Sequence, residues 1–249
     1  MEKGREVRFQ PYEGANLEEV KLYLLGSCMG ALLHQKKILP MHGSGINLAG
    51  NGLLLTGRSG AGKSTVAAAF FRQGCRILAD DVLPVRLDET GFPIAFPGYP
   101  HNKLCRDAVE RMAENTRLGS VQSISKNRDK FSVAYIDSFQ TEPVPLKIIC
   151  DLVPEEVKEL QRKEITGVEK IHVIHRNTYR RFMTQGLKTA QWHFEQCTRI
   201  AEKVRVLRIE RPKYGHQENE IAALILPEFF KPREGASKPW TGTDERRNP

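Results

Sequence analysis

The sequence lacks the marks of a membrane protein and of a disulfide-rich secreted protein. None of its apolar runs reaches 18 residues, and the opening MEKGREVRF has no apolar core of the kind found in signal peptides. Its five cysteines are widely spaced and include no C-x-x-C pair, so neither a disulfide framework nor a zinc site is expected. These absences predict a cytoplasmic protein that contacts no membrane.

Modules that read nucleic acids are also missing, although the chain is basic. There is no zinc finger, no aromatic and basic strand signature and no basic heptad helix, so nucleic acid is not expected as a partner. Lys and Arg exceed Asp and Glu by 38 to 30, which gives a net charge of +8. We interpret this charge as suited to an anionic nucleotide and an acidic polypeptide substrate.

Length and composition predict one globular domain. The 249 residues, 40% of them hydrophobic, suffice for a single well-buried core and leave little for a second. We expect this domain to span residues 1–230. Residues 231–249, rich in Pro, Gly, Ser, Thr and charge, are predicted to form a disordered tail.

The most informative stretch is TGRSGAGKST at residues 56–65, which follows an apolar run of leucines. Gly57, four further residues and then Gly62-Lys63-Ser64 give the full Walker A spacing. The glycines let backbone N–H groups approach a polyphosphate, Lys63 brings charge to the outer phosphates, and Ser64 offers a hydroxyl to Mg²⁺. The alternative is a structural glycine turn. The predicted contacts to ATP are Gly57, Arg58, Ser59, Gly60, Ala61, Gly62, Lys63, Ser64 and Thr65.

Two adjacent carboxylates, Asp80 and Asp81, close a short apolar strand predicted over residues 75–79. The carboxyl end of such a strand faces the ligand in open α/β sheets, so one carboxylate there would bind Mg²⁺. The second would point to the other side of an extended backbone and accept a proton from an incoming hydroxyl. The alternative is an ordinary Walker B pair with the metal role alone.

A histidine precedes the phosphate loop. His42 begins a strand predicted over residues 42–48. A hairpin turn over Ala49-Gly50-Asn51-Gly52, with Asn51-Gly52 at positive φ, joins it to the strand that feeds the loop. An imidazole there would orient the nucleophile, share its proton with Asp81 or stabilise charge on the transferred group. A structural histidine is the alternative.

The wider pattern departs from simple β-α-β alternation and predicts an α/β protein with a mixed sheet. Its elements are a helix over 17–35, a helix that ends at Gly74, a hairpin over 82–96, a helix over 102–115, a mobile loop over 116–130, strands over 131–136 and 146–152, a long helix over 177–204 bent at Gly186, a last strand over 205–209 and a short helix over 218–226.

Residues 39–82, LPMHGSGINLAGNGLLLTGRSGAGKSTVAAAFFRQGCRILADDV, resemble the catalytic core of HPr kinase/phosphorylase. The shared features are a His before the loop, GxSGxGKS, a helix ending in Gly, and ADD. The resemblance implies an HPr kinase / PEP carboxykinase-like P-loop domain in which helices flank a mixed sheet. It also implies a catalytic set of Asp81, His42 and Lys63, with Asp81 as the base for a serine hydroxyl and His42 assisting, and metal contacts from Ser64 and Asp80.

Outside this core the chain departs from bacterial HPr kinase, whose second, Gly-rich and Ile-rich signature is replaced by FPGYPHNKLCRDAV at 96–109. With GSCMGALLHQKKILPMHGSGI upstream and NTYRRFM downstream, this segment resembles the smaller HPr-kinase-like enzymes of lasso peptide biosynthesis. That resemblance implies an Mg-ATP-dependent kinase for the C-terminal serine of a precursor peptide. The predicted peptide contacts in a basic groove are Lys103, Arg106, Arg117, Lys126, Arg128 and Lys130.

Three alternatives stay open at this point. In the first, the chain is also a serine kinase, but its acceptor is HPr or another carrier protein. In a different class, the chain would be a P-loop ATPase or switch without a phosphoacceptor. A weaker third alternative is small-molecule or carboxykinase-type phosphotransfer. The sequence leaves the oligomeric state open.

Overall fold

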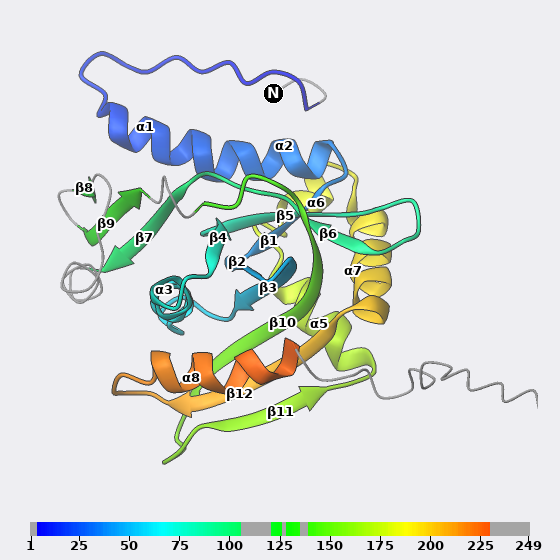
Figure 1. The fold of residues 1–249 in the computed structure, drawn as a ribbon. Coiled ribbons are helices and arrows are strands. Elements are labelled where there is room, and N and C mark those ends of the chain that lie inside the picture. The colour runs from blue at the N-terminus through cyan, green and yellow to red at the C-terminus, as the bar shows by residue number, and fades with distance from the viewer. Residues whose placement is uncertain (1–3, 106–120, 126–127, 135–138, 230–249) are drawn as a thin grey trace, which may run out of the picture.

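A mixed sheet of nine strands forms the centre of the computed structural model, which describes residues 4–105, 121–125, 128–134 and 139–229 (Figure 1). Along the sheet the order is β1 (Leu39–His42), β5 (Val82–Leu87), β6 (Pro93–Ala95), β10 (Val144–Glu155), β3 (Asn51–Thr56), β2 (Ser44–Leu48) and β4 (Arg76–Ala79). β12 (Arg205–Pro212) also pairs with β10, and β11 (Gln161–Ile165) pairs with β12. β10 runs parallel to β3 and β12, and the other pairs are antiparallel, which confirms the predicted mixed sheet.

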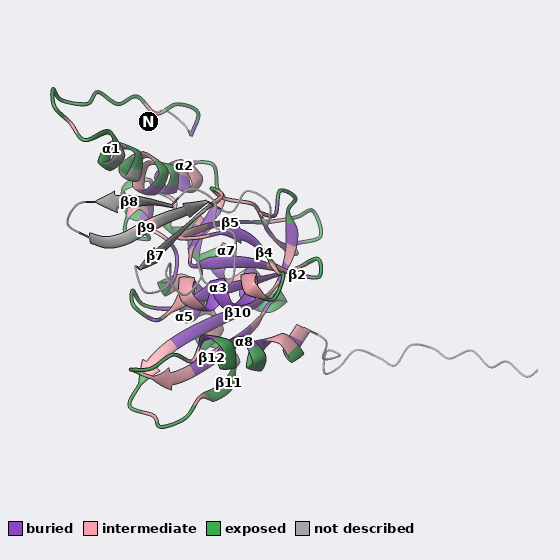
Figure 2. Ribbon diagram, turned by 60° about the vertical axis from the view of Figure 1, so that its left-hand side comes forward, coloured by how far each residue is buried: buried purple, intermediate pink, exposed green. Residues whose placement is uncertain are grey.

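Helices cover both faces of this sheet. α3 (Lys63–Arg72) and α8 (Glu218–Ile225), which continues into a 3₁₀ turn at Leu226–Phe229, bury one face. α5 (Val168–Arg176) and α7 (Ala190–Lys203) bury the other, with the short α6 (Met183–Gly186) before α7. α1 (Leu17–Tyr23), a π-helical turn (Leu24–Cys28) and α2 (Met29–Gln35) cross the top of Figure 1. Figure 2 shows the buried residues concentrated in the central strands and in α3.

The periodicity of side-chain direction along each strand or helix explains which side chains enter the core on each face of the sheet. Side chains alternate along a strand, so Ile148, Cys150 and Leu152 of β10 pack under α3 and α8, and Ile149 packs under α5 and α7. α3 buries Ala67 to Phe70 completely or almost so, and small alanines let the helix lie close to the sheet. The predicted stop at Gly74 is confirmed, because that glycine takes the left-handed φ of 84° that favours this residue.

A separate three-stranded sheet follows in the order β7 (His101–Cys105), β9 (Arg128–Ala134) and β8 (Val121–Ser125). The predicted helix over 102–115 is therefore wrong for residues 102–105, and the predicted loop over 116–130 is wrong where β8 and β9 form. The polar sequence of these strands has little periodicity and therefore does not predict them. Pairing between the strands stabilises them here. The rest of both predicted segments, residues 106–120 and 126–127, lies outside the described residues.

Three local predictions near the site need correction. The predicted strand over 42–48 is two strands, because the chain turns at Gly43, where a Cβ would lie 2.2 Å from the Leu55 carbonyl oxygen. The hairpin turn lies within the predicted residues 49–52, but its positive φ values are at Ala49 and Gly50, 48° and 82°, and not at Asn51-Gly52, since Asn51 already pairs with Leu48. The predicted helix over 177–204 is α6 and α7, separated by a turn and preceded by a non-helical segment that pairs with β1 through Thr178 and Met41.

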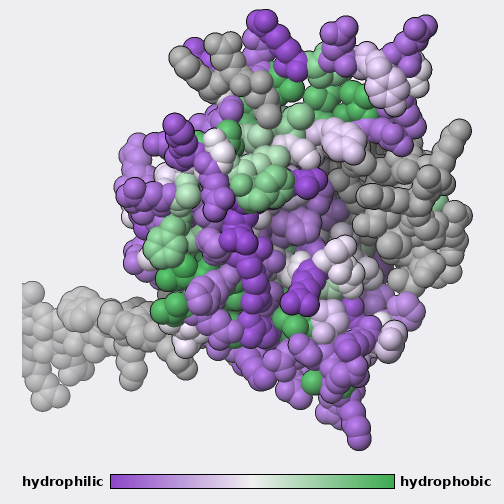
Figure 3. All heavy atoms as spheres, turned by 180° about the vertical axis from the view of Figure 1, so that it is seen from behind, coloured by the Kyte–Doolittle hydropathy of each residue, from purple (hydrophilic) through white to green (hydrophobic). Residues whose placement is uncertain are grey.

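Helices in the described part of the chain do not combine the length and the apolar character that a membrane span requires. Figure 3 shows the face hidden in Figure 1 as mostly hydrophilic, with hydrophobic side chains in small groups, one of them near the top at the level of α1 and α2. The predicted tail, residues 231–249, lies outside the described residues.

Candidate functional site

The loop between β3 and α3 takes a conformation that only glycine adopts readily. Gly57, Gly60 and Gly62 have φ of 134°, 82° and 94°, and a Cβ at Gly57 would lie 2.4 Å from the carbonyl oxygen of Leu152. The loop therefore curls over the end of β3 and directs its backbone into the N-terminus of α3. The ammonium of Lys63 lies over this loop and donates to the carbonyl oxygens of Gly57 and Arg58 at 3.0 and 3.1 Å.

Asp80 joins the phosphate loop to the sheet. Its carboxylate accepts from the Ser64 hydroxyl, the first-turn serine of α3, at 3.1 and 3.4 Å, and from the buried Ser44 hydroxyl on β2 at 2.6 Å. Two hydroxyl donors thus fix the orientation of the carboxylate next to Ser64. Within the described residues, no group of three His, Cys, Asp or Glu side chains is arranged to hold a metal ion. Ser64 and Asp80 fit Mg²⁺, which takes few protein ligands and completes its shell with phosphate and water.

Asp81 points elsewhere and pairs with His42. Its Oδ1 lies 3.4 Å from His42 Nδ1, and its carbonyl oxygen lies 3.0 Å from the same nitrogen. Because a carbonyl oxygen only accepts, Nδ1 carries the proton. The two neighbouring carboxylates diverge for a reason that differs from the prediction: Asp81 is not extended but left-handed, with φ of 75°, in the turn between β4 and β5.

His42 is held from three directions. Its backbone N–H donates to the Asn177 carbonyl at 2.7 Å, and its carbonyl accepts from the Thr56 hydroxyl at 2.8 Å. The Tyr179 ring lies 5.8 Å from the imidazole, centroid to centroid. His42 was predicted to lie on the strand next to β3. It ends β1, which pairs with β5, and the strand that pairs with β3 is β2.

Arg211, at the end of β12, holds the loop through two of its carbonyl groups. Its guanidinium donates to the carbonyl oxygens of Ala61 and Gly60 at 3.0 and 3.3 Å. Burial lowers the pKa of Arg211, and the nearby Glu218 carboxylate opposes that shift. The same side chain reaches the amide oxygen of Gln217 at 3.5 Å.

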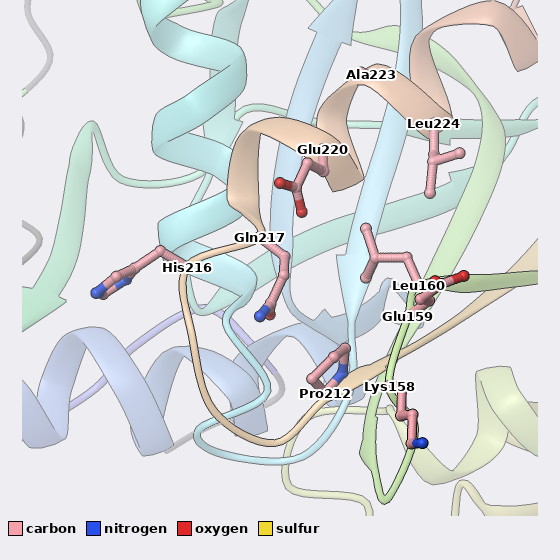
Figure 4. A pocket seen from close by; sticks show the side chains of 9 residues that line it. All are labelled: Lys158, Glu159, Leu160, Pro212, His216, Gln217, Glu220, Ala223 and Leu224. Atoms are coloured by element: carbon pink, nitrogen blue, oxygen red, sulfur yellow. The ribbon is translucent and has the colours of Figure 1, made fainter.

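Gln217 also lines a cavity of about 670 Å³ (Figure 4). The cavity lies between the β10–β11 connection, the β12–α8 connection and α8 itself. Its lining residues are Lys158, Glu159, Leu160, Pro212, His216, Gln217, Glu220, Ala223 and Leu224. None of the residues predicted from the sequence to form the site lines it.

The predicted residues thus fall into two neighbouring groups. Lys63, Ser64 and Asp80 meet at the phosphate loop, where Arg58 and Ser59 are exposed and Thr65 is half-buried, and His42 and Asp81 meet beside it.

In the predicted basic groove, Arg106, Arg117 and Lys126 lie outside the described residues. Lys103, Arg128 and Lys130 are on β7 and β9, with their side chains not described. Sequence reasoning assigned no role to Ser44, Thr56, Tyr179 and Arg211. The first three lie within the quoted segments MHGSGI, TGRSGAGKST and NTYRRFM, and Arg211 carried no signal.

A strand that enters a glycine-rich loop with Lys and Ser at the start of a helix, and a carboxylate bonded to that Ser, define a P-loop site. Residues 34–92 match the model of the HPr serine kinase C-terminal domain. HPr kinase/phosphorylase from Leptospira biflexa is 30% identical over 129 residues, which are 52% of this chain and 35% of that protein. The homologue from Chlorobium limicola is 44% identical over 54 residues, 22% of this chain and 15% of that protein.

These matches relate the core of the chain to the HPr kinase/phosphorylase family, as the residues 39–82 predicted. The chain spans about a third of the length of the first of these relatives. A solved HPr(Ser) kinase/phosphatase from Coxiella burnetii aligns with 77% of this chain and 96% of its own at 12% identity, with a TM-score of 0.38. The resemblance to the enzymes of lasso peptide biosynthesis stays a prediction.

Proposed function

We propose that the protein is an Mg-ATP-dependent serine kinase that phosphorylates the C-terminal serine of a ribosomally made precursor peptide of the lasso type. The observation that carries the proposal is the divergence of Asp80 and Asp81. Asp80 bonds Ser64 of the phosphate loop, and Asp81 pairs with His42. A site for nucleotide binding alone requires only the first arrangement. The second supports the proposal because it supplies a separate carboxylate with an ordered partner, as a base for a hydroxyl acceptor requires.

In this reaction Mg-ATP supplies the phosphoryl group and neutralises charge around it. The backbone N–H groups of the loop and the Lys63 ammonium would hold the phosphates, with Ser64 and Asp80 as ligands of the metal. The Asp81 carboxylate would take the serine proton as the serine oxygen attacks the γ-phosphorus and ADP departs. His42 keeps Asp81 in place through its Nδ1–H.

The test is phosphate transfer from radiolabelled ATP to a peptide that ends in serine, with the Asp81→Asn variant beside the wild type. A general base contributes about 10²- to 10⁴-fold, so we expect Asp81→Asn to lose transfer at least about 100-fold while it binds ATP as the wild type does. Glu89→Gln, in the exposed turn between β5 and β6, is the matched control and should stay active. Full activity of Asp81→Asn would show that Asp81 is not the base.

A second candidate acceptor is HPr itself or a similar carrier protein. The relatives that match the core carry the name HPr kinase/phosphorylase, and this favours a protein serine as the acceptor. Adding purified HPr in place of the peptide separates the two acceptors in one gel. Phosphate release at a high rate with neither acceptor present would favour an ATPase or switch.

A further inference from the structure

The segment that connects α5 to α6 covers the edge of the sheet next to His42. Thr178 pairs with Met41 of β1, the Tyr179 N–H donates to the Pro40 carbonyl at 2.8 Å, and the Asn177 carbonyl accepts from His42. β1 is the end strand of the sheet path, so this segment extends the sheet by a short, local pairing. It therefore brings a part of the chain far away in sequence to the acceptor side of the proposed site.

Tyr179 is built into this place as a fixed platform. Two glycines, Gly26 in the π-helical turn and Gly30 in α2, make room for it: a Cβ at Gly30 would lie 2.8 Å from the ring, and one at Gly26 would lie 3.1 Å from the phenol oxygen. His34 bonds the Tyr179 carbonyl oxygen through Nε2 at 3.0 Å. π-Helical turns are rare and frequent at functional sites. His42 is also a neighbour of the ring, with a centroid distance of 5.8 Å.

Arg180 places a positive charge on the outer side of this platform. Its guanidinium carbon lies 5.5 Å from the centroid of the Tyr179 ring, its side chain is exposed, and its backbone has a left-handed φ of 51°. A left-handed backbone is unfavourable for arginine and persists where the surroundings impose it. The neighbouring Arg176 and Arg181 are also exposed, and Arg176 is paired with the buried Asp151.

We propose that Tyr179 and Arg180 form the binding site for the acceptor peptide and select a carboxylate next to the phosphorylated serine. The proposal rests on the proposed function above. The peptide backbone would lie on the Tyr179 ring, with its carboxylate bound by Arg180 and the hydroxyl at Asp81. The site belongs to the acceptor and not to the nucleotide because Tyr179 contacts His42, the partner of Asp81, whereas Lys63, Ser64 and Arg211 surround the phosphate loop. Guanidinium is the cation that pairs best with a carboxylate, by two parallel hydrogen bonds.

Binding is measured first, because it does not depend on turnover. The probe is a fluorescein-labelled decapeptide that ends in Asp-Ser with a free carboxylate, titrated with the full chain in fluorescence polarisation. A charge-assisted hydrogen-bond pair predicts that Arg180→Ala weakens binding at least about tenfold. The same peptide with an amidated C-terminus and Asn in place of Asp should bind wild type and Arg180→Ala alike. Arg180→Glu should prefer this neutral peptide to the acidic one.

The matched control is Arg86→Ala, which removes another exposed arginine that lies over an aromatic ring, Phe96, at 5.2 Å. It should bind the acidic peptide as the wild type does. Equal affinity of wild type and Arg180→Ala for the acidic peptide would overturn the proposal.

A kinetic comparison separates this site from the proposed function. With the acidic peptide as acceptor, Arg180→Ala should raise KM about tenfold and leave kcat within about threefold, since Arg180 positions the acceptor and does not transfer the proton. If Arg180→Ala instead lowered kcat about tenfold and left KM unchanged, the assignment of Arg180 to acceptor binding would be overturned. If the wild type binds the acidic peptide through Arg180 but transfers phosphate to no acceptor, the proposed function fails and the binding site stands.

Discussion

The proposed phosphate side of the site is one continuous stretch, from Thr56 through α3 and β4 to Asp80, whereas the proposed acceptor side joins segments near residues 42, 81 and 179. The first rests on an apolar core, in which Ala67 to Phe70 are buried against the sheet. The second rests on buried polar groups. His193 bonds the Thr178 hydroxyl at 2.8 Å, and His34 bonds the Tyr179 carbonyl at 3.0 Å.

This difference shows how each side is kept in one arrangement. Apolar packing is tolerant of detail, while a buried polar group costs free energy unless its hydrogen bonds are made, so it specifies one geometry. Nδ1 of His34 is buried without a hydrogen-bond partner among the described residues, which fits a neutral imidazole that donates through Nε2. The acceptor side should therefore be the more sensitive of the two to local substitutions and to pH.

The largest expected effect is at Gly43, where the two sides join. Gly43→Ala would place a Cβ 2.2 Å from the Leu55 carbonyl oxygen and 2.6 Å from the Leu54 side chain. We expect the free energy of unfolding to fall by about 3 kcal/mol, measured by urea denaturation. Gly186→Ala, with nothing within 4 Å of the added Cβ, is the control and should change it by less than about 1 kcal/mol. A stable Gly43→Ala would mean that the junction can shift to admit a side chain.

The next effect separates the two sides by ligand. Lys63→Ala removes the ammonium over the loop, and we expect ATP affinity to fall about 100-fold, equivalent to about 2.7 kcal/mol, in calorimetric titration. Asp81→Asn should change that affinity less than about threefold. Lys203→Ala, at the exposed end of α7, is the charge control. If both site variants lost ATP equally, the division into a phosphate side and an acceptor side would be wrong.

Acid should act on the acceptor side. Burial and the neighbouring His175 and His34 lower the pKa of His193 from 6.5 to about 4. The unfolded chain then takes up the proton first, so the stability from neutral His193 is complete above about pH 6.5 and is lost as the pH falls toward 4. This residue should make unfolding about 2 kcal/mol easier at pH 5 than at pH 7. His193→Gln should show a smaller difference between the two pH values in urea denaturation; an undiminished difference would exclude His193 as its source.

The smallest effect tests a single bond between the two sides. Thr56→Val keeps the shape of the side chain and removes the donor to the His42 carbonyl. We expect a loss of about 1 kcal/mol in unfolding free energy. Thr198→Val removes a similar side-chain to backbone bond on the exposed part of α7 and should cost less than about 0.5 kcal/mol. Equal costs would show that the Thr56 bond adds nothing beyond a surface interaction.

Most of the arrangement on the phosphate side was predicted from the sequence because its residues lie close together along the chain. The Walker A spacing, the stop at Gly74 and the Asp80-Asp81 pair all lie within a few turns of the same chain segment, and the structure places Lys63, Ser64 and Asp80 together. Only part of the acceptor side was predicted from the sequence. The His42–Asp81 pair was one of the options that the residues left open and that the family resemblance favoured, but its geometry depends on the left-handed Asp81.

The positions of Tyr179 and Arg180 were not predicted, although both lie in the NTYRRFM segment, because tertiary pairing overrides periodicity. Apolar residues at helical spacing predicted one helix over 177–204, yet Asn177 and Tyr179 bond the edge of β1 instead. No short-range pattern indicates a partner more than a hundred residues away. β11 was missed for a simpler reason: in Gln161–Ile165 only the last residue is buried, so the strand has no apolar alternation.

The position of β10 has a consequence for the order in which the protein folds. β3, which carries the phosphate loop, obtains its parallel neighbour only from residues 144–155, and β10 in turn obtains its own from residues 205–212. Contacts of such long sequence separation form slowly, and the sheet centre stays open during synthesis until β12 has left the ribosome. A nascent chain that already contains the complete Walker A sequence therefore has no finished cradle for phosphate.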